Sequence, residues 1–424
     1  MTKKGKWMVA SVVLILGLLI AGFGCAPATP PTQEVETLNF GVLAPISGPM
    51  GVAGVDIARG LELWADDVNS RGGFDIGGVT YMAKAIQYDD GGFLPAESLE
   101  AFQRGYQRDG TKFWMSTGVQ AINEPIAEWS QANAPDTLYT LWGVSPAISP
   151  KYPNIIGTNY WAINAAPYML YYKEVLGVET MVNMTPDAAF GLDSKTWATV
   201  GARAAGIEIL AQMNFPLDAP DYRSVMQQAM SYNPDLIFVN AGGALQEVAM
   251  EAALYELGYE GLKFETNFDL TAALDKMPES YLEGLGNPNP QFPTPADGEI
   301  PYNLYTAYDE KWPGEWADHA QIIGCIIGPF LETAIKGANS IDPEDILAWL
   351  SANKNNIDHP VFGKCVMTGE AIWGVDRFLA NPYWYAEIRG GVSKVITTLP
   401  IDPFLTTYVD TTRDVLMEAG MLEE

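Results

Sequence analysis

Residues 41–55 read GVLAPISGPMGVAGV and place an apolar run, a glycine-rich turn and the start of a helical pattern in immediate succession. The run 38–43 is predicted to be a strand, and the apolar residues from Ile57 to Val68 recur at helical spacing. Glycines at such a turn often cradle a phosphate. Here the spacing is G-x-x-G-x-x-G, however, and no P-loop lysine follows. The stretch therefore predicts a strand–loop–helix unit whose loop lets the backbone approach a ligand closely.

The same unit recurs along the chain. In the first half, strands are expected at 81–88, 112–115 and 137–142, with helices at 95–106 and 123–131. In the second half, helices are expected at 167–175, 190–205, 222–232 and 245–257, with strands at 180–184, 207–213, 235–239 and 263–266. This alternation is typical of parallel sheets covered by helices on both faces, so the predicted class is α/β with two comparable halves.

The remaining segments predict a more complex chain path. Residues 282–303 are rich in Pro, Gly and Asn and indicate a connection, after which residues 304–350 return to a helical pattern. A late strand is expected at 384–388 and a closing helix at 409–421.

Length, charge and residue types narrow the function. A chain of 424 residues favours two domains, and a formal net charge of -28 argues against nucleic-acid binding. His319 and His359 are the only two histidines, and no motif surrounds either, so both are interpreted as structural. With no GxSxG, HExxH or P-loop pattern, we expect neither an enzyme nor a metal or cofactor site.

The N-terminus has the features of an export signal. Lys3, Lys4 and Lys6 precede an apolar run at 7–24, which ends at Cys25, and this order resembles a bacterial lipoprotein signal with Cys25 as the lipidated residue. The alternative is an uncleaved membrane anchor helix. Residues 26–37 are expected to be a flexible tether. In either case we expect an exported protein, in the periplasm or on the outer face of the cytoplasmic membrane.

Two cysteines remain after Cys25. Cys325 lies in an apolar helical pattern, and we interpret it and Cys365 as separate buried thiols, with a disulfide as the alternative.

The order of motifs resembles the type I periplasmic solute-binding proteins of ABC importers, in particular the branched-chain amino acid and amide-binding group. The matching stretches, in sequence order, are 45–49 (PISGP), 69–73 (NSRGG), 88–91 (YDDG), 145–146 (SP), 190–191 (FG), 233–237 (NPDLI) and 363–365 (GKC). No single motif is decisive, but their order and spacing extend over about 330 residues.

The resemblance implies two Rossmann-like lobes joined by three crossover strands. Lobe one is expected to comprise residues 38–158 and 290–370, and lobe two residues 159–289 and 371–424. Ligands of open parallel sheets bind outside the carboxyl ends of the strands, so the site is expected in a closing interlobe cleft. The candidate loops are 45–54, 116–123 and 142–146 in lobe one, and 185–191, 240–245 and 266–270 in lobe two.

In such proteins the 116–123 loop holds the α-carboxylate of the ligand at a helix N-terminus. The candidate ligand-binding residues in these loops are Ser47, Met50, Gln120, Ala121, Trp142, Gly143, Val144, Ser145, Phe190, Gly243, Asn267, Phe268 and Asp269. The usual recognition set is incomplete, because only Glu265 or Asp269 is near enough in sequence to face an α-ammonium. Trp142, Phe190 and Phe268, with Tyr160 and Trp161, would make the pocket aromatic, although core packing is the alternative for each ring. Trp114 lies within a strand and is interpreted as core.

The leading hypothesis is a non-enzymatic, monomeric capture protein that delivers a small apolar amino acid or carboxylate to an ABC permease. Branched and aromatic ligands both fit. The alternatives are a ligand-sensing receptor domain on the same fold and a secreted enzyme.

Overall fold

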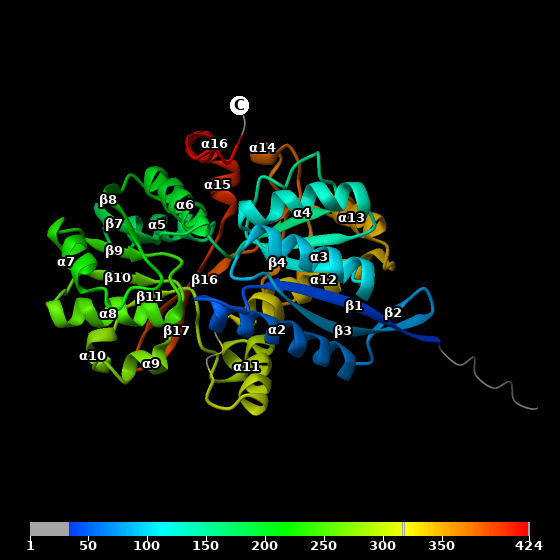
Figure 1. Ribbon diagram of the computed structural model, residues 1–424, viewed down its shortest axis with the longest axis horizontal. Coiled ribbons are helices and arrows are strands. Elements are labelled where there is room, and N and C mark those ends of the chain that lie inside the picture. Colours follow the sequence, from blue (N-terminus) through cyan, green and yellow to red (C-terminus); the bar gives the residue numbers. More distant parts are fainter. Residues whose placement is uncertain (1–33, 316, 318, 423–424) are drawn as a thin grey trace, which may run out of the picture.

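The computed structural model describes residues 34–422 except positions 316 and 318, and it forms two α/β lobes side by side (Figure 1). The strands of lobe one are β1 (Glu34–Ala44), β2 (Phe74–Ile76), β3 (Val79–Asp89), β4 (Phe113–Thr117), β5 (Leu138–Trp142), β6 (Ile155–Thr158), β14 (Met367–Thr368) and β15 (Phe378–Leu379). They form one sheet in the order β14-β15-β6-β5-β4-β1-β3-β2. The central pairs, from β15 to β3, are all parallel.

Lobe two contains a seven-stranded sheet in the order β17-β16-β11-β10-β9-β7-β8. Its strands are β7 (Thr180–Pro186), β8 (Glu208–Phe215), β9 (Leu236–Val239), β10 (Leu262–Glu265), β11 (Gly286–Asn287), β16 (Tyr383–Ile388) and β17 (Ser393–Leu399). A separate hairpin of β12 (Ile357–His359) and β13 (Gly363–Cys365) belongs to neither sheet.

Helices cover both faces of each sheet, as the alternating pattern predicted. Those of lobe one are α2 (Gly51–Ser70), α3 (Pro95–Asp109), α4 (Gln120–Asn133), α11 (Glu299–Lys311), α12 (Gly328–Ala338), α13 (Pro343–Ala352) and α14 (Glu370–Trp373). Those of lobe two are α5 (Ala165–Glu174), α6 (Ala189–Ala205), α7 (Arg223–Ser231), α8 (Ala244–Leu257), α9 (Leu270–Leu274) and α10 (Glu279–Leu282). The chain closes with α15 (Asp402–Thr406) and α16 (Val409–Glu418), which lie over the junction of the lobes (Figure 1).

A short 3₁₀ turn at Pro295–Asp297 and a π-helix at Ile322–Ile327 complete the elements. The π-helix is fully buried, runs directly into α12, and contacts both α2 and strand β5.

The two-lobed α/β fold expected from the sequence is confirmed, and two expected limits need correction. The expected tether overlaps β1, because Glu34 to Thr37 already pair with Val79 to Met82 of β3. The lobe-one sheet also extends beyond 370, since β15 pairs with β6 there. The signal at 1–25, Cys25 and tether residues 26–33 lie outside the described residues.

Three crossover segments join the lobes, at residues 159–164, 288–298 and 380–382. The first and third are tied together by reciprocal hydrogen bonds. The Asn159 backbone N–H donates to Asn381 Oδ1 over 3.0 Å, and Asn381 Nδ2 donates to the Asn159 carbonyl over 3.1 Å. Both asparagines are buried, so this pair holds the first and third crossover segments together.

The core positions agree with the sequence interpretation. Trp114 is fully buried and packs on Phe102, with ring centroids 4.5 Å apart. Cys325 and Cys365 are both buried free thiols. Within residues 34–422, apart from the two undescribed positions, no helix is long and apolar enough to cross a membrane.

Candidate functional site

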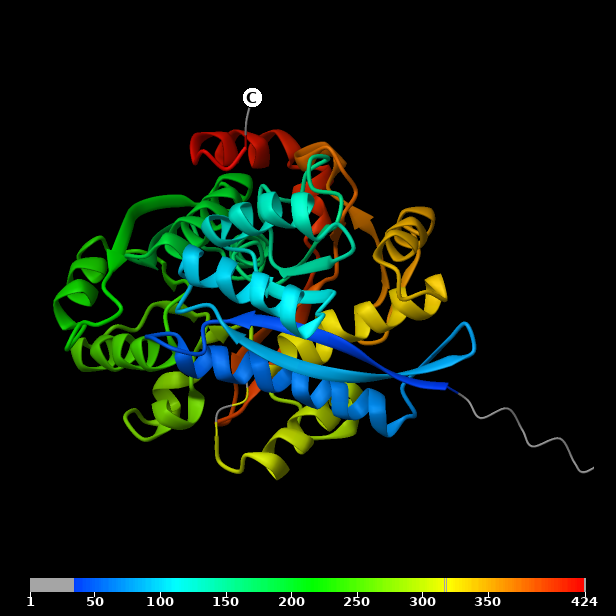
Figure 2. The same cartoon turned by 45° about the vertical axis from the view of Figure 1, so that its right-hand side comes forward.

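The carboxyl ends of the two parallel sheets point toward each other at the junction between the lobes (Figures 1 and 2). The candidate loops 45–54, 185–191, 240–245 and 266–270 make contacts across it. In lobe one these ends belong to β1, β3, β4 and β5, and in lobe two to β7, β9 and β10. This is the position at which open α/β sheets bind ligands.

A buried hydrogen bond connects the lobes at the base of this junction. His319 Nε2, from lobe one, lies 2.7 Å from Asn267 Oδ1 in lobe two. The Asn267 amide nitrogen donates to the Gly242 carbonyl, so its oxygen faces the imidazole and Nε2 must carry the proton. Burial lowers the pKa of His319 to about 3, which keeps the ring neutral.

Asp56 of α2 holds the segment that carries His319. Its Oδ2 accepts the backbone N–H groups of both His319 and Ala320, the latter over 3.0 Å. Burial raises the pKa of Asp56 to about 8, more than these hydrogen bonds lower it. His319 was interpreted from sequence as structural, and its contact across the junction was missed.

Three aromatic rings from three segments pack together at the junction. The Phe93 ring, in the loop after β3, lies 5.0 Å from that of Phe190 in α6. Trp161 of the first crossover lies 5.9 Å from Phe190 and 6.2 Å from Phe93, between centroids. Asp90 shapes the loop, because its Oδ1 accepts the N–H groups of Gly92 and Phe93 over 2.9 and 2.8 Å.

Phe93 was not among the predicted residues, because the loop after β3 was left out of the candidate set. An aromatic residue directly after the carboxyl end of a parallel strand was the available signal.

The structure divides the predicted aromatic pocket into three groups. Phe190 and Trp161 join Phe93, whereas Trp142 and Tyr160 are buried in the core of lobe one. Tyr160 nonetheless reaches the junction, since its ring centroid lies 6.4 Å from that of His319. Phe268 packs in a separate cluster with Leu270 and Met277, so its expected place beside the other rings is wrong.

Several predicted residues come together across the junction. Met50 of lobe one is 8% exposed, and its Sδ would lie only 3.5 Å from a Cβ built on Gly243 of lobe two. Val144 is buried against the 116–123 loop, because a Cβ on Gly118 would lie 2.8 Å from the Val144 nitrogen. Gly143 and Ser145 are buried beside it, and Ser145 Oγ accepts the Ala147 N–H.

Other predicted site residues lie at the edge of the junction or stabilise a single helix. Ser47 is exposed, with its N–H 3.2 Å from Asp89 Oδ1. Gln120 and Ala121 begin α4 and also line a cavity of about 720 Å³ beside Gly420 to Leu422. Asp269 caps α9 through the Ala272 N–H, at 2.9 Å.

Glu265 was expected as one possible partner of an ammonium group. It ends β10 and lies next to Glu247 and Glu251 of α8. Burial, together with the charges of these two neighbours, raises its pKa well above the ordinary range. Glu247 Oε2 also accepts the Asn267 N–H over 2.6 Å. Glu247 therefore supports the Asn267 loop from inside lobe two. Among the described residues, no group of three or more His, Cys, Asp or Glu is arranged to hold a metal ion.

One carboxyl group that the sequence did not single out crosses the junction. Asp193 of α6 lies beside the backbone N–H of Gln120, the first residue of α4, and this contact lowers its pKa. It is 4% exposed, and burial raises its pKa to about 8. Sequence patterns gave no signal for it, because they do not show which helices of the two lobes meet.

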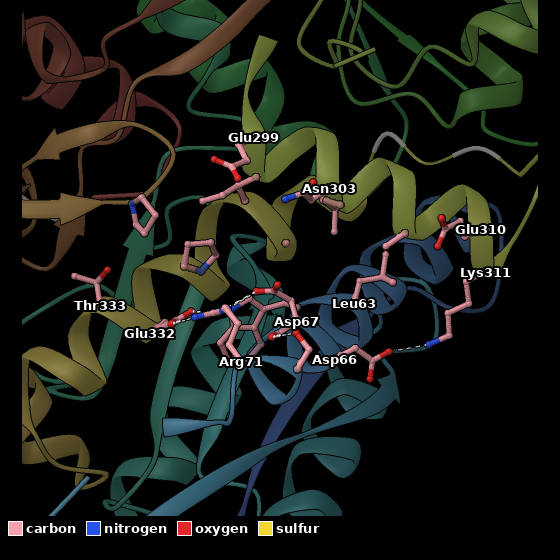
Figure 3. A pocket seen from close by; sticks show the side chains of 18 of the residues that line it. Leu63, Asp66, Asp67, Arg71, Glu299, Asn303, Glu310, Lys311, Glu332 and Thr333 are labelled. Carbon is pink, nitrogen blue, oxygen red and sulfur yellow. Dashed lines mark hydrogen bonds and ion pairs between the residues drawn. The ribbon is translucent and has the colours of Figure 1, made fainter. Parts of the chain in front are cut away.

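A larger cavity, of about 980 Å³, lies elsewhere, on the side of lobe one between α2, α11 and α12 (Figure 3). Its floor includes Leu63, Leu304 and Pro329. Ion pairs cross its wall and rim: Arg71 Nη1 lies 2.7 Å from Glu332 Oε1, and Lys311 Nζ 3.0 Å from Asp66 Oδ2. None of the predicted ligand-binding residues lines it.

Known proteins share this architecture. A leucine-binding protein from Thermotoga maritima MSB8 has 16% identity and a TM-score of 0.66, covering 86% of this chain and 99% of that one. A solute-binding protein of an ABC transporter from R. palustris, solved with benzoate, has 17% identity and a TM-score of 0.66, covering 86% and 97%. A periplasmic binding protein from Burkholderia mallei has 19% identity and a TM-score of 0.68, covering 89% and 98%. These likenesses establish the fold.

By sequence, the chain is 22% identical over 255 residues to "Leu/Ile/Val-binding protein homolog 6" of Brucella melitensis biotype 1. The match spans 59% of this chain and 62% of that relative. The family profile described as "Periplasmic binding protein" matches residues 37–392, which is most of the chain, and the protein therefore belongs to the periplasmic binding protein family.

Proposed function

We propose that this protein captures a small, largely apolar amino acid or carboxylate between its lobes and delivers it to an ABC importer. The observation that carries the proposal is the opposition of two parallel sheets across a hinged junction, with their carboxyl-end loops in contact. A ligand enclosed there would exchange water for contacts from both lobes, and closure would follow from its binding to both.

The side chains at the junction support an apolar ligand. Phe93, Trp161 and Phe190 offer ring faces, and Met50 and Val144 add aliphatic surface. The fold relatives are consistent with this class. One is a leucine-binding protein, and two R. palustris proteins were solved with benzoate and 4-hydroxybenzoate.

A thermal-shift screen tests the binding function. Branched-chain and aromatic amino acids would be compared with benzoates and short branched carboxylates, each at millimolar concentration. A ligand at a hundred times its Kd stabilises the folded state by about 2.7 kcal/mol, which should raise Tm by several degrees. The proposal fails if neither class produces a shift. In that case the family fold would serve another kind of ligand.

Delivery and anchoring need cellular measurements. Deleting the gene should abolish high-affinity uptake of the ligand found in the screen, and complementation should restore it. Unchanged uptake, with an altered transcriptional or motile response to the ligand, would favour a sensing role instead. We also propose that Cys25 carries a lipid anchor. Cys25→Ser should then move the protein from the membrane to the soluble fraction, whereas an uncleaved helix would keep it bound.

A further inference from the structure

The N-terminus of α4 is already occupied by a carboxyl group of the protein. The Gln120 N–H, at the helix end where a ligand carboxylate was expected, lies beside Asp193 from the opposite lobe. Free N–H groups at a helix N-terminus favour an anion, and the Asp193 carboxyl group takes that position. A ligand carboxylate would have to displace this side chain.

The other oxygen of Asp193 is buried without a hydrogen-bond partner. Oδ2 has no such partner within the part of the chain that the structure describes. No Lys or Arg of that part forms an ion pair with Asp193 either. A buried carboxylate is costly unless a cation or a hydrogen bond compensates it. Burial therefore keeps the unpartnered group mainly protonated near neutral pH, with a pKa of about 8, and a positively charged partner would restore its ionised form.

Aromatic rings stand beside this carboxyl group. Phe190 precedes Asp193 by three residues in α6, so the two side chains share one face of the helix. Phe190 is also the ring that contacts both Phe93 and Trp161, and these two rings are only partly buried. Ring faces attract cations, most strongly where water is excluded. A carboxylate and three rings together form a binding environment for an ammonium group attached to an apolar body.

The net charge of the whole chain also favours a cationic ligand. With a formal net charge of -28, the protein attracts cationic ligands and repels simple anions.

We propose that Asp193 determines specificity by pairing with an ammonium group of the ligand, so that the junction selects an amine or amino acid over a carboxylate with the same hydrocarbon body. This inference rests on the proposed function, because it names which of the two ligand classes the site takes. The Phe93, Trp161 and Phe190 rings hold the apolar part next to the charge.

The test uses matched ligands that each lack one charged group. For an aromatic body these are L-phenylalanine, 2-phenylethylamine and 3-phenylpropanoate. For a branched body they are L-leucine, 3-methylbutylamine and 4-methylpentanoate. Titration calorimetry with the full mature chain should show that, for at least one body, the amine binds about tenfold or more tightly than the carboxylate.

Asp193→Asn supplies the second measurement. Asparagine keeps the size of the side chain and a polar oxygen beside Gln120, while the charge is removed. Amine affinity should fall about tenfold or more, and carboxylate affinity should be unchanged or rise. The matched control is Asp275→Asn, which makes the same change at an exposed position after α9 and should alter neither affinity.

The outcomes separate the two proposals. Tighter binding of the carboxylates by the natural protein overturns the inference and leaves the capture function standing. Equal loss of amine binding in the Asp193 and Asp275 variants also overturns it, since bulk charge would then explain the preference. If no member of either series binds, the capture function itself is refuted and the inference falls with it.

Discussion

His319 and Asn267 form a buried 2.7 Å hydrogen bond between the two lobes, although 52 positions separate them in sequence. His319→Ala removes this bond. Because a neutral hydrogen bond contributes about 1 kcal/mol, the ligand-free protein should shift toward open forms and bind its ligand several-fold more weakly. Small-angle scattering should record a larger radius of gyration. His359→Ala is the control, since His359 bonds the Ile326 carbonyl within lobe one and should affect stability but not opening.

Closure without ligand should depend on pH through Asp193. Burial raises the pKa of this group from 3.8 to about 8, so the closed form favours the protonated acid. Because the pKa of Asp193 is raised in the closed form, its protonated form favours closure. Its contribution to closure is fully present below the ordinary pKa of an aspartate and is lost as pH rises through about 8. The radius of gyration should therefore increase between pH 6 and pH 9.

The Asp193→Asn variant should lack this part of the pH dependence. Asp56 and Glu247 also have raised pKa values, but each supports its own lobe, so their titration should appear in unfolding and persist in the variant. Identical opening curves for the two proteins would rule out Asp193 as the group responsible.

Gly118→Ala should disturb the junction through the backbone. The added Cβ would lie 2.8 Å from both the nitrogen and the oxygen of Val144, so the two loops must separate. We expect about a tenfold or greater loss of ligand affinity, measured by calorimetry. Gly337→Ala is a matched control, since it forces a Cβ against the Trp349 ring far from the junction. It should lower Tm without changing affinity.

Trp142 and Trp114 should differ in their effects on binding. Both are buried in the core of lobe one, but Trp142 is the last residue of β5, at the carboxyl end that faces the junction, whereas Trp114 lies between Phe102 and Tyr88. Trp142→Phe should weaken binding several-fold. Trp114→Phe should lower the free energy of unfolding by about 1–3 kcal/mol and leave affinity unchanged. Equal effects on affinity would remove Trp142 from the site.

The ion pair at the lobe-one cavity gives a second pH signature. Burial alone would raise the pKa of Glu332, but hydrogen bonds from Arg71 and Lys336 lower it. Glu332→Gln should reduce the free energy of unfolding by about 1 kcal/mol at pH 7, because Arg71 is partly exposed. Because the pKa of Glu332 is lowered in the folded state, its ionised form is the one that stabilises the fold. The difference in free energy of unfolding between the two proteins should therefore disappear as pH falls through the ordinary range of a glutamate. Urea unfolding at pH 7 and pH 3.5 measures both values.

The sequence predicted the repeating architecture because each strand and helix has its own apolar period. Helix ends at glycine could be predicted for the same reason. Gly206, for example, follows α6 in a left-handed conformation with φ of 70°. The junction was harder to predict. Asp193 and Phe93 meet their partners only through the relative position of the lobes, and the Asn159–Asn381 pair joins residues 222 positions apart. Local periodicity contains no information about such pairs.

The position where β1 begins has a mechanical consequence. Strand β1 begins at the end of lobe one that points away from lobe two (Figure 1), and all eleven of its residues, from Glu34 onward, pair in parallel with β3. Tension applied to the protein at Glu34 would load that whole ladder in shear, so that its hydrogen bonds share the force. The force would also be applied about 33 Å from the ligand junction, which is the length of β1 at 3.3 Å per residue. A protein moored by this end would hold one lobe still and leave the other free to swing.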